Sequence, residues 1–181
     1  MLPESKYARI EVERRFLLGS FPSGEKVTRT RRISDRYIEG TRLRLRQQCD
    51  SDSQPVFKLT QKLPRGTARS QQGLITSIYL TREEFNVLAT LPAKELTKVR
   101  HSVPPFGIDV FEGKLSGLAL AEAEFSSEAE ASALVLPSFI VAEISDDRRF
   151  TGGSLVTASR EELDKWLAEY GISPNSVGRT D

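Results

Sequence analysis

The sequence predicts an α+β fold in which eight or nine antiparallel strands close into a β-barrel, a tunnel with helices packed on its outside. Charged and apolar residues alternate with a period of two in one predicted strand after another, and two residues is the repeat of a β-strand. In a closed barrel the charged face can point into the lumen while helices cover the apolar face. Helical signals are few and lie between or after the strands.

The composition is that of one globular domain. The chain has 181 residues, of which 38% are hydrophobic and 28% are charged, enough for a single core. We expect one domain over residues 1–172 and a disordered tail over 173–181. Lys plus Arg number 26 and Asp plus Glu 25, so the net charge gives no reason to expect nucleic acid or an anionic membrane as a partner.

Cysteine and histidine are too scarce for several kinds of site. The single Cys49 excludes an internal disulfide, and the single His101 leaves any metal to oxygen ligands, which favour Mg²⁺, Mn²⁺ or Ca²⁺. The sequence shows no leader and no apolar run long enough to span a membrane. We therefore expect a cytoplasmic protein.

The first predicted strand covers residues 9–16. Its two-residue period places Glu11, Glu13 and Arg15 on one face, opposite Val12 and Phe16. A solvated face is the simplest explanation for three charges at this spacing. The recurrence of the pattern in later strands argues against it.

A long hairpin is predicted over residues 27–48, with Gly40 in its turn. On the return strand, Arg42, Arg44 and Arg46 share one face. Three arginines repel each other unless anions lie among them, although a solvent-facing ladder is the alternative.

The next strand, residues 56–62, places Lys58 and Lys62 together. A basic segment over residues 64–72 then precedes a strand over 74–80.

Capping boxes mark two helices. Thr81 and Glu84 open a helix that runs to about Leu91, and Ser159 and Glu162 open the last helix, over residues 160–170. Ser127 caps a short helix between them. We expect the apolar stripe of the last helix, which contains Leu163, Trp166, Leu167 and Tyr170, to face the core.

Strands in the second half carry more acids. They are predicted over residues 95–103, 107–112, 118–125 and 141–145, and residues 151–154 read as a loop. The candidate lumen residues of all strands are the acids Glu11, Glu13, Asp109, Glu122, Glu124 and Glu143, and the bases Arg15, Arg42, Arg44, Arg46, Lys58, Lys62, Lys98 and Arg100.

The segment Glu11-Val12-Glu13-Arg14-Arg15 resembles the N-terminal Glu-x-Glu-x-Lys signature of the CYTH domain, the triphosphate tunnel metalloenzymes. These include inorganic triphosphatases, thiamine triphosphatases and class IV adenylyl cyclases. Further matches follow in the family's order over about residues 7–170: Arg44-Leu45-Arg46, Leu59-Thr60-Gln61-Lys62, Lys98-Val99-Arg100, Ile108-Asp109-Val110-Phe111, residues 118–125 and residues 143–150. Arg15 departs from the usual lysine, and its broader guanidinium does not readily lose a proton.

The resemblance implies a metal-dependent phosphohydrolase that cleaves the terminal phosphate of inorganic triphosphate, thiamine triphosphate or ATP, with Mg²⁺ or Mn²⁺ as cofactor. The implied catalytic residues are Glu11, Glu13, Arg15, Lys62 and Arg100. The implied phosphate ligands are Arg44, Arg46, Lys58, Lys62, Lys98 and Arg100. The implied metal ligands are Glu11, Glu13, Asp109, Glu122, Glu124 and Glu143.

Several alternatives stay open at this point. The same tunnel could make cyclic AMP and pyrophosphate from ATP, or it could bind polyphosphate or a nucleotide without catalysis. A barrel that carries an apolar ligand is disfavoured by the charged alternation. Lys58 and Arg42 could be exposed, Asp109 could orient a lysine, and the charges at 146–149 are typical of a solvated loop. Oligomeric state is also open, with a homodimer as one arrangement.

Overall fold

Nine antiparallel strands dominate the computed structural model, which describes residues 8–50, 53–64 and 71–173, with the backbone alone at 10, 11, 64 and 71–73. The strands are β1 (Arg9–Leu18), β2 (Arg29–Ile38), β3 (Leu43–Asp50), β4 (Val56–Pro64), β5 (Gln71–Leu80), β6 (Ala93–Val103), β7 (Phe106–Phe111), β8 (Ala119–Phe125) and β9 (Ile140–Glu143). The helices are α1 (Arg82–Leu88), α2 (Glu128–Ser132), α3 (Gly152–Leu155) and α4 (Arg160–Glu169), with single turns η1 (Gly113–Leu115) and η2 (Arg148–Phe150).

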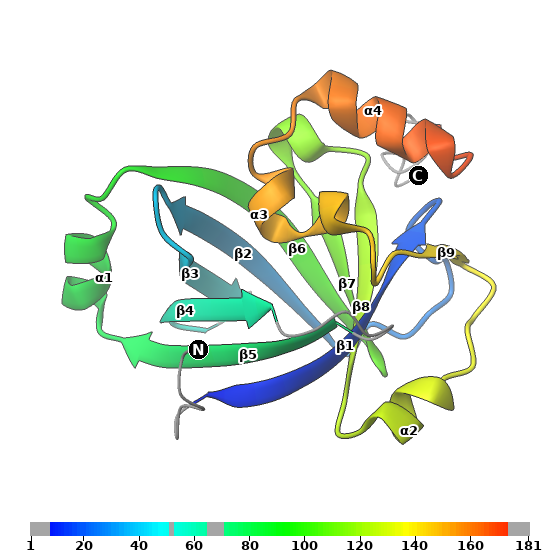
Figure 1. The fold of residues 1–181 in the computed structure, drawn as a ribbon, viewed down its shortest axis with the longest axis horizontal. Helices are drawn as coiled ribbons and strands as arrows, with labels where there is room; N and C mark the ends of the chain where they lie inside the picture. The colour runs from blue at the N-terminus through cyan, green and yellow to red at the C-terminus, as the bar shows by residue number, and fades with distance from the viewer. Residues whose placement is uncertain (1–7, 51–52, 65–70, 174–181) are drawn as a thin grey trace.

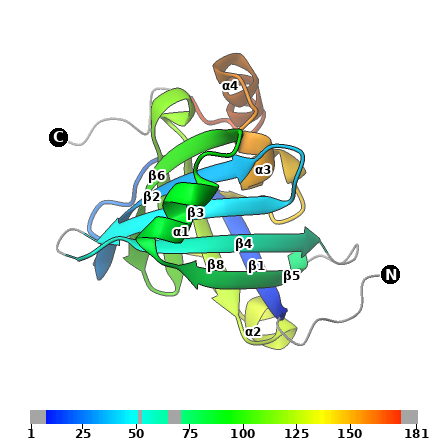
Figure 2. The ribbon, with the colours of Figure 1, turned by 90° about the vertical axis from the view of Figure 1, so that its left-hand side faces the viewer.

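The strands form one sheet in the order β5-β4-β3-β2-β6-β7-β8-β1-β9, and β5 also pairs with the first half of β1. Figure 2 shows β6, β2, β3, β4 and β5 in succession on the near side, with β1 and β8 behind them. The α+β class with an antiparallel sheet is thus confirmed. Closure of the sheet into a barrel stays a prediction.

The register gives the sheet two chemically different faces, because residues opposite each other on paired strands share a face. We call one of them the charged face. It carries Glu13, Arg15, Asp35, Arg44, Arg46, Lys58, Lys62, Lys98, Arg100, Asp109, Glu122 and Glu124. On the opposite face, Phe16, Ile108 and Ala121 belong to an apolar cluster with Phe139 and Ile140.

One end of the charged face is apolar and covered. Leu17, Leu96 and Leu120 continue this face and are buried in one cluster with Phe150 of η2 and Leu163 of α4. Figure 1 shows α3 and α4 beside this end of β6, β7 and β8. The expectation that the helices lie on the outside is therefore wrong for α3 and α4, since leucines replace charges at this end and require an apolar cover.

The capping boxes of α1 and α4 form as predicted, at Thr81 and Ser159. However, α1 ends at Leu88, short of Leu91, and it buries no residue fully; its Phe85 packs on Phe57 of β4 with ring centroids 4.6 Å apart. The predicted loop over 151–154 is instead the start of α3, which is helical from Gly152. Thr151 caps α3, and its side chain accepts a hydrogen bond from the Ser154 amide.

Parts of two predictions lie outside the described residues: the basic segment at 65–70 and the tail at 174–181. In the described part of the chain, no helix combines the length and the apolar character that a membrane crossing needs.

Candidate functional site

Asp109 is the centre of the first cluster on the charged face. Its carboxylate accepts a hydrogen bond from Lys98 Nζ and a bidentate pair from Arg100, whose Nε and Nη2 lie 2.7 and 2.6 Å away. Arg100 Nη2 also donates to Glu122. Asp109 is fully buried, so removing these two cations would leave an uncompensated charge. This geometry favours the structural alternative for Asp109, in which it orients Lys98 and Arg100.

Asp35 on β2 forms a second cluster. It lies opposite Arg46 in the β2–β3 register, and Arg46 Nε and Nη2 donate to its two oxygens at 2.6 and 2.7 Å. Arg44 Nε lies 3.7 Å from the same carboxylate. Burial alone would raise the pKa of Asp35, but Arg46 and Arg44 outweigh it and hold the pKa below its ordinary value. Asp35 is therefore an anion that holds two phosphate-ligand candidates in place.

Sequence reasoning missed Asp35. A signal was available, because counting back from the turn at Gly40 places Asp35 on the same face as Arg44 and Arg46. Gly40 takes the positive φ, 69°, that the turn requires. The loop between β2 and β3 also contains Thr41 and Arg42.

Glu13 on β1 is the centre of a third cluster. Lys62 Nζ donates to Glu13 Oε1 at 2.9 Å, and Arg15 Nε lies 3.7 Å from that oxygen. Glu13 and Arg15 are buried, whereas the Lys62 side chain is 40% exposed. Lys62 is thus the cation of this group most accessible to an incoming anion.

The three clusters share one electrostatic environment. Burial alone would raise the pKa of Glu122, but the positive charges of Arg100, Lys98 and Lys62 outweigh it and hold the pKa well below its ordinary value. Lys98 likewise helps to lower the pKa of Asp35. Glu122 and Asp35 are therefore ionised near neutral pH, and each faces several cations.

The acids proposed as metal ligands do not form a cluster of their own among the described residues. Glu13 and Glu124 lie directly opposite each other on β1 and β8, a position in which like charges repel unless a cation lies nearby. Glu124 is exposed, and Glu11 lies in β1 with its side chain outside the described part. Within the described residues, no three acids, cysteines or histidines already gather around one point. The donors are oxygens, which suits Mg²⁺ or Mn²⁺.

The structure does not bring Glu143 into the charged face. In the β1–β9 register Glu143 lies opposite Phe16, on the other side of β1 from Glu13. It pairs there with Arg14, whose Nε and Nη2 donate to its oxygens at 3.0 and 2.7 Å. The expectation that Glu143 faces the lumen is wrong, because β9 pairs with the end of β1 in the register that turns this side chain away.

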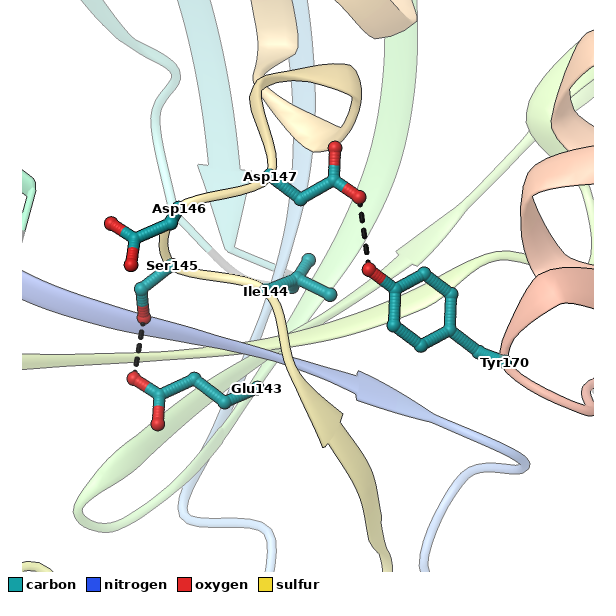
Figure 3. Close-up of a pocket in the computed structure, with 6 residues that line it drawn as sticks. All are labelled: Glu143, Ile144, Ser145, Asp146, Asp147 and Tyr170. Atoms are coloured by element: carbon teal, nitrogen blue, oxygen red, sulfur yellow. Dashed lines mark hydrogen bonds between the residues drawn. The ribbon is translucent and has the colours of Figure 1, made fainter. Parts of the chain in front are cut away.

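Glu143 instead lines a surface pocket after β9, together with Ile144, Ser145, Asp146, Asp147 and Tyr170 (Figure 3). Asp147 accepts hydrogen bonds from Tyr170 Oη and from Arg149, and Arg149 also donates to Glu169 of α4. The expectation of a solvated loop is therefore wrong for Asp147 and Arg149, which fasten η2 to α4. The acidic lining makes this pocket unsuited to a phosphate anion.

Lys58 shares the charged face and lies opposite Arg46, with its ammonium 4.9 Å from the centre of the Tyr79 ring. Tyr79 is 73% exposed, whereas Lys58 itself is half-buried, so the exposed alternative for Lys58 stays a prediction. Arg42 is exposed in the β2–β3 turn.

Comparison with known proteins decides the family. No protein-family model matches the sequence. The inorganic triphosphatase of Nitrosomonas europaea is 33% identical over 152 residues, which cover 80% of this chain and 95% of the relative. The chain belongs to the CYTH family, the triphosphate tunnel metalloenzymes.

Solved structures agree with this CYTH assignment. The crystal structure of the inorganic triphosphatase NE1496 matches with a TM-score of 0.54 and 26% identity, over 82% of this chain and 95% of that one. A second structure, of the hypothetical protein NE1496, matches with the same score and identity over 99% of its length. Of the CYTH signature positions, β1 carries Glu11, Glu13 and Arg15.

Proposed function

We propose that the protein is a metal-dependent triphosphatase that cleaves the terminal phosphate of inorganic triphosphate, or of a small organic triphosphate, on the charged face. One observation carries the proposal: the relative named inorganic triphosphatase is 33% identical and is matched over nearly its whole length. The clustered cations of the charged face support it chemically, since phosphoryl transfer depends on positioning and charge stabilisation.

We also propose that the sheet closes into a tunnel. The pairing of Arg9–Glu13 with Gln71–Ile75 supports closure, because it joins β5, the first strand of the sheet order, to β1 near the other end. Closure would make the charged face a lumen. Charges in a lumen of low water content act more strongly on a polyanion than the same charges on an open surface.

Exchange of ion pairs gives a binding mechanism. In the structure, Arg46, Lys98, Arg100 and Lys62 are each paired with an acid of the protein itself. A triphosphate carries about four negative charges near neutral pH, so it competes with those acids for the cations. Arg44 is paired with Asp35 more loosely than Arg46 is, because its Nε lies 3.7 Å from that carboxylate and lacks a hydrogen-bond partner among the described residues.

The acids that this exchange would release are Glu13, from Lys62, and Glu122, from Arg100, and both are metal-ligand candidates. Glu13, Glu122 and Glu124, with Glu11, would hold Mg²⁺ or Mn²⁺. When bound, such an ion would supply positive charge against the phosphate oxygens and would lower the pKa of a coordinated water. In this mechanism Arg44, Arg46 and Lys62 bind and orient the phosphate oxygens, while Asp35 and Asp109 stay in place as anchors for Arg46 and Arg100.

The test is product analysis with purified protein. Inorganic triphosphate, thiamine triphosphate and ATP are each supplied with Mg²⁺, Mn²⁺ or EDTA, and phosphate, pyrophosphate and cyclic AMP are measured. The proposal predicts phosphate release from at least one triphosphate, abolished by EDTA. Cyclic AMP with pyrophosphate from ATP would replace it with a cyclase. Tight triphosphate binding without turnover would replace it with a binding protein.

A further inference from the structure

Both the side chain and the backbone of Arg15 form hydrogen bonds with the segment at residues 144–150. Its Nη1 donates to the Phe150 carbonyl at 2.8 Å and its Nη2 to the Ser145 carbonyl at 3.1 Å. Its backbone amide donates to Ser145 Oγ at 3.0 Å, and its carbonyl accepts from the Ile144 amide at 2.8 Å. The side chain is only 4% exposed, and two of its three guanidinium nitrogens donate to carbonyls of this one segment.

The segment that Arg15 holds covers one end of the charged face. Phe150 is buried against the same cluster as Leu17 and Leu120 of that face. Directly after it, Gly152 of α3 lies so close to Tyr37 of β2 that a Cβ at 152 would be 1.9 Å from Tyr37 Oη. The position of residues 145–152 therefore determines where the charged face ends.

We infer that Arg15 is a positioning residue: its guanidinium fastens the segment Ser145–Phe150 across this end of the charged face and braces Glu13, without contacting the triphosphate. The inference rests on the proposed function only in taking the charged face as the substrate site. Its Nε lies 3.7 Å from Glu13 Oε1, so one side chain joins the covering segment to a metal-ligand candidate.

This role explains why arginine stands where CYTH proteins usually have lysine. The two contacts use two different nitrogens of one planar fork to reach two carbonyls, while the third nitrogen faces Glu13. A lysine ammonium carries its three donors on one compact nitrogen at the end of a flexible stem, so it lacks the spread of the guanidinium fork. Lysine can therefore replace the charge at this position but cannot hold both carbonyls and brace Glu13 at once.

The first test is hydrogen exchange on the substrate-free Arg15→Lys variant. The inference predicts that amides over residues 144–151 exchange about tenfold faster or more, because the segment opens locally, while amides of β2 and β3 are unchanged. Exchange identical to wild type over 144–151 would overturn the inference. Because no substrate is present, this result stands even if the proposed function fails, whereas a wild-type protein without triphosphatase activity would refute that function alone.

A second test separates position from charge. Ser145→Ala removes the hydroxyl that accepts from the Arg15 amide but leaves the guanidinium in the protein. For both Arg15→Lys and Ser145→Ala, we expect kcat for triphosphate to fall with KM within about twofold, the pattern of a misplaced catalytic group. If Arg15→Lys raises KM strongly while Ser145→Ala behaves as wild type, Arg15 contacts the phosphates and the inference is wrong.

Discussion

Asp35 is an anion buried among cations. Its side chain is 1% exposed and holds Arg46 through both oxygens. A buried carboxylate with this partner cannot be replaced by a neutral group without leaving Arg46 partly uncompensated.

Replacing Asp35 with Asn is expected to lower the free energy of unfolding by about 3 kcal/mol and to raise KM for triphosphate about tenfold or more, since Arg46 loses its fixed orientation. Urea unfolding and steady-state kinetics measure the two effects. Asp50→Asn is the matched control, because Asp50 pairs with Arg29 and Arg31 in a more exposed position, and we expect little change in either quantity. Equal effects of the two substitutions would contradict the anchoring role.

Glu122 links stability to pH. Its pKa in the folded protein lies well below its ordinary value, so the unfolded chain takes up this proton first as pH falls. Its contribution to stability is present above the unfolded pKa, about 4.3, and is lost as pH falls below it.

The Glu122→Gln variant should therefore lose less stability than wild type between about pH 5 and about pH 3, with a slope smaller by up to about 1.4 kcal/mol per pH unit. Urea unfolding across this range measures both slopes. Parallel curves for the two proteins would show that Glu122 is not held ionised by Arg100 and its neighbours.

At the scale of single residues, strand alternation was enough to predict most of the charged face. The two-residue repeat of a strand is enough to place Glu13, Arg44, Lys62 and Arg100 on this face. Glu143 was assigned to the wrong face because the alternation of residues within β9 does not reveal how β9 pairs with β1. Asp35 was overlooked for a related reason, since its importance lies in a partner on the next strand.

Among the elements, α3 was the one that sequence reasoning missed. Gly152 and Gly153 are typical of a loop, yet Gly152 is required for a tertiary reason, its close approach to Tyr37. The capping boxes of α1 and α4, by contrast, are local signals and were read correctly. Elements stabilised by their own sequence can be predicted from it, whereas α3 depends on what it packs against.

The two glycines of α3 give a matched pair of substitutions. Gly152→Ala should lower the free energy of unfolding by about 1–3 kcal/mol or more through overpacking against Tyr37. Nothing lies within 4 Å of a Cβ at Gly153, so Gly153→Ala should be neutral or slightly stabilising. Thermal and urea unfolding provide the comparison, and adding Tyr37→Phe should restore part of the loss. Similar values for the two alanine variants would argue against the close packing of α3.

At the scale of the whole molecule, the antiparallel α+β fold followed from the repeated alternation. The covering of one end by α3 and α4 did not, although the apolar residues that cause it were visible. Leu120 shares a strand face with Glu122, and Phe111 shares one with Asp109. Such a change from charged to apolar along one face indicates where a cover must pack, but it does not identify the segment that provides it.

The central claim, that triphosphate is hydrolysed on the charged face, is tested most directly by kcat/KM for inorganic triphosphate with Mg²⁺ in Arg44→Ala and Arg32→Ala. Arg44 lies on the charged face, whereas Arg32 of the same hairpin lies on the opposite face, pairs with Glu112 and has a side chain that is 70% exposed. Loss of a charge-assisted contact should reduce kcat/KM about 10- to 100-fold in Arg44→Ala, with Arg32→Ala close to wild type. Equal values for the two variants would contradict the claim.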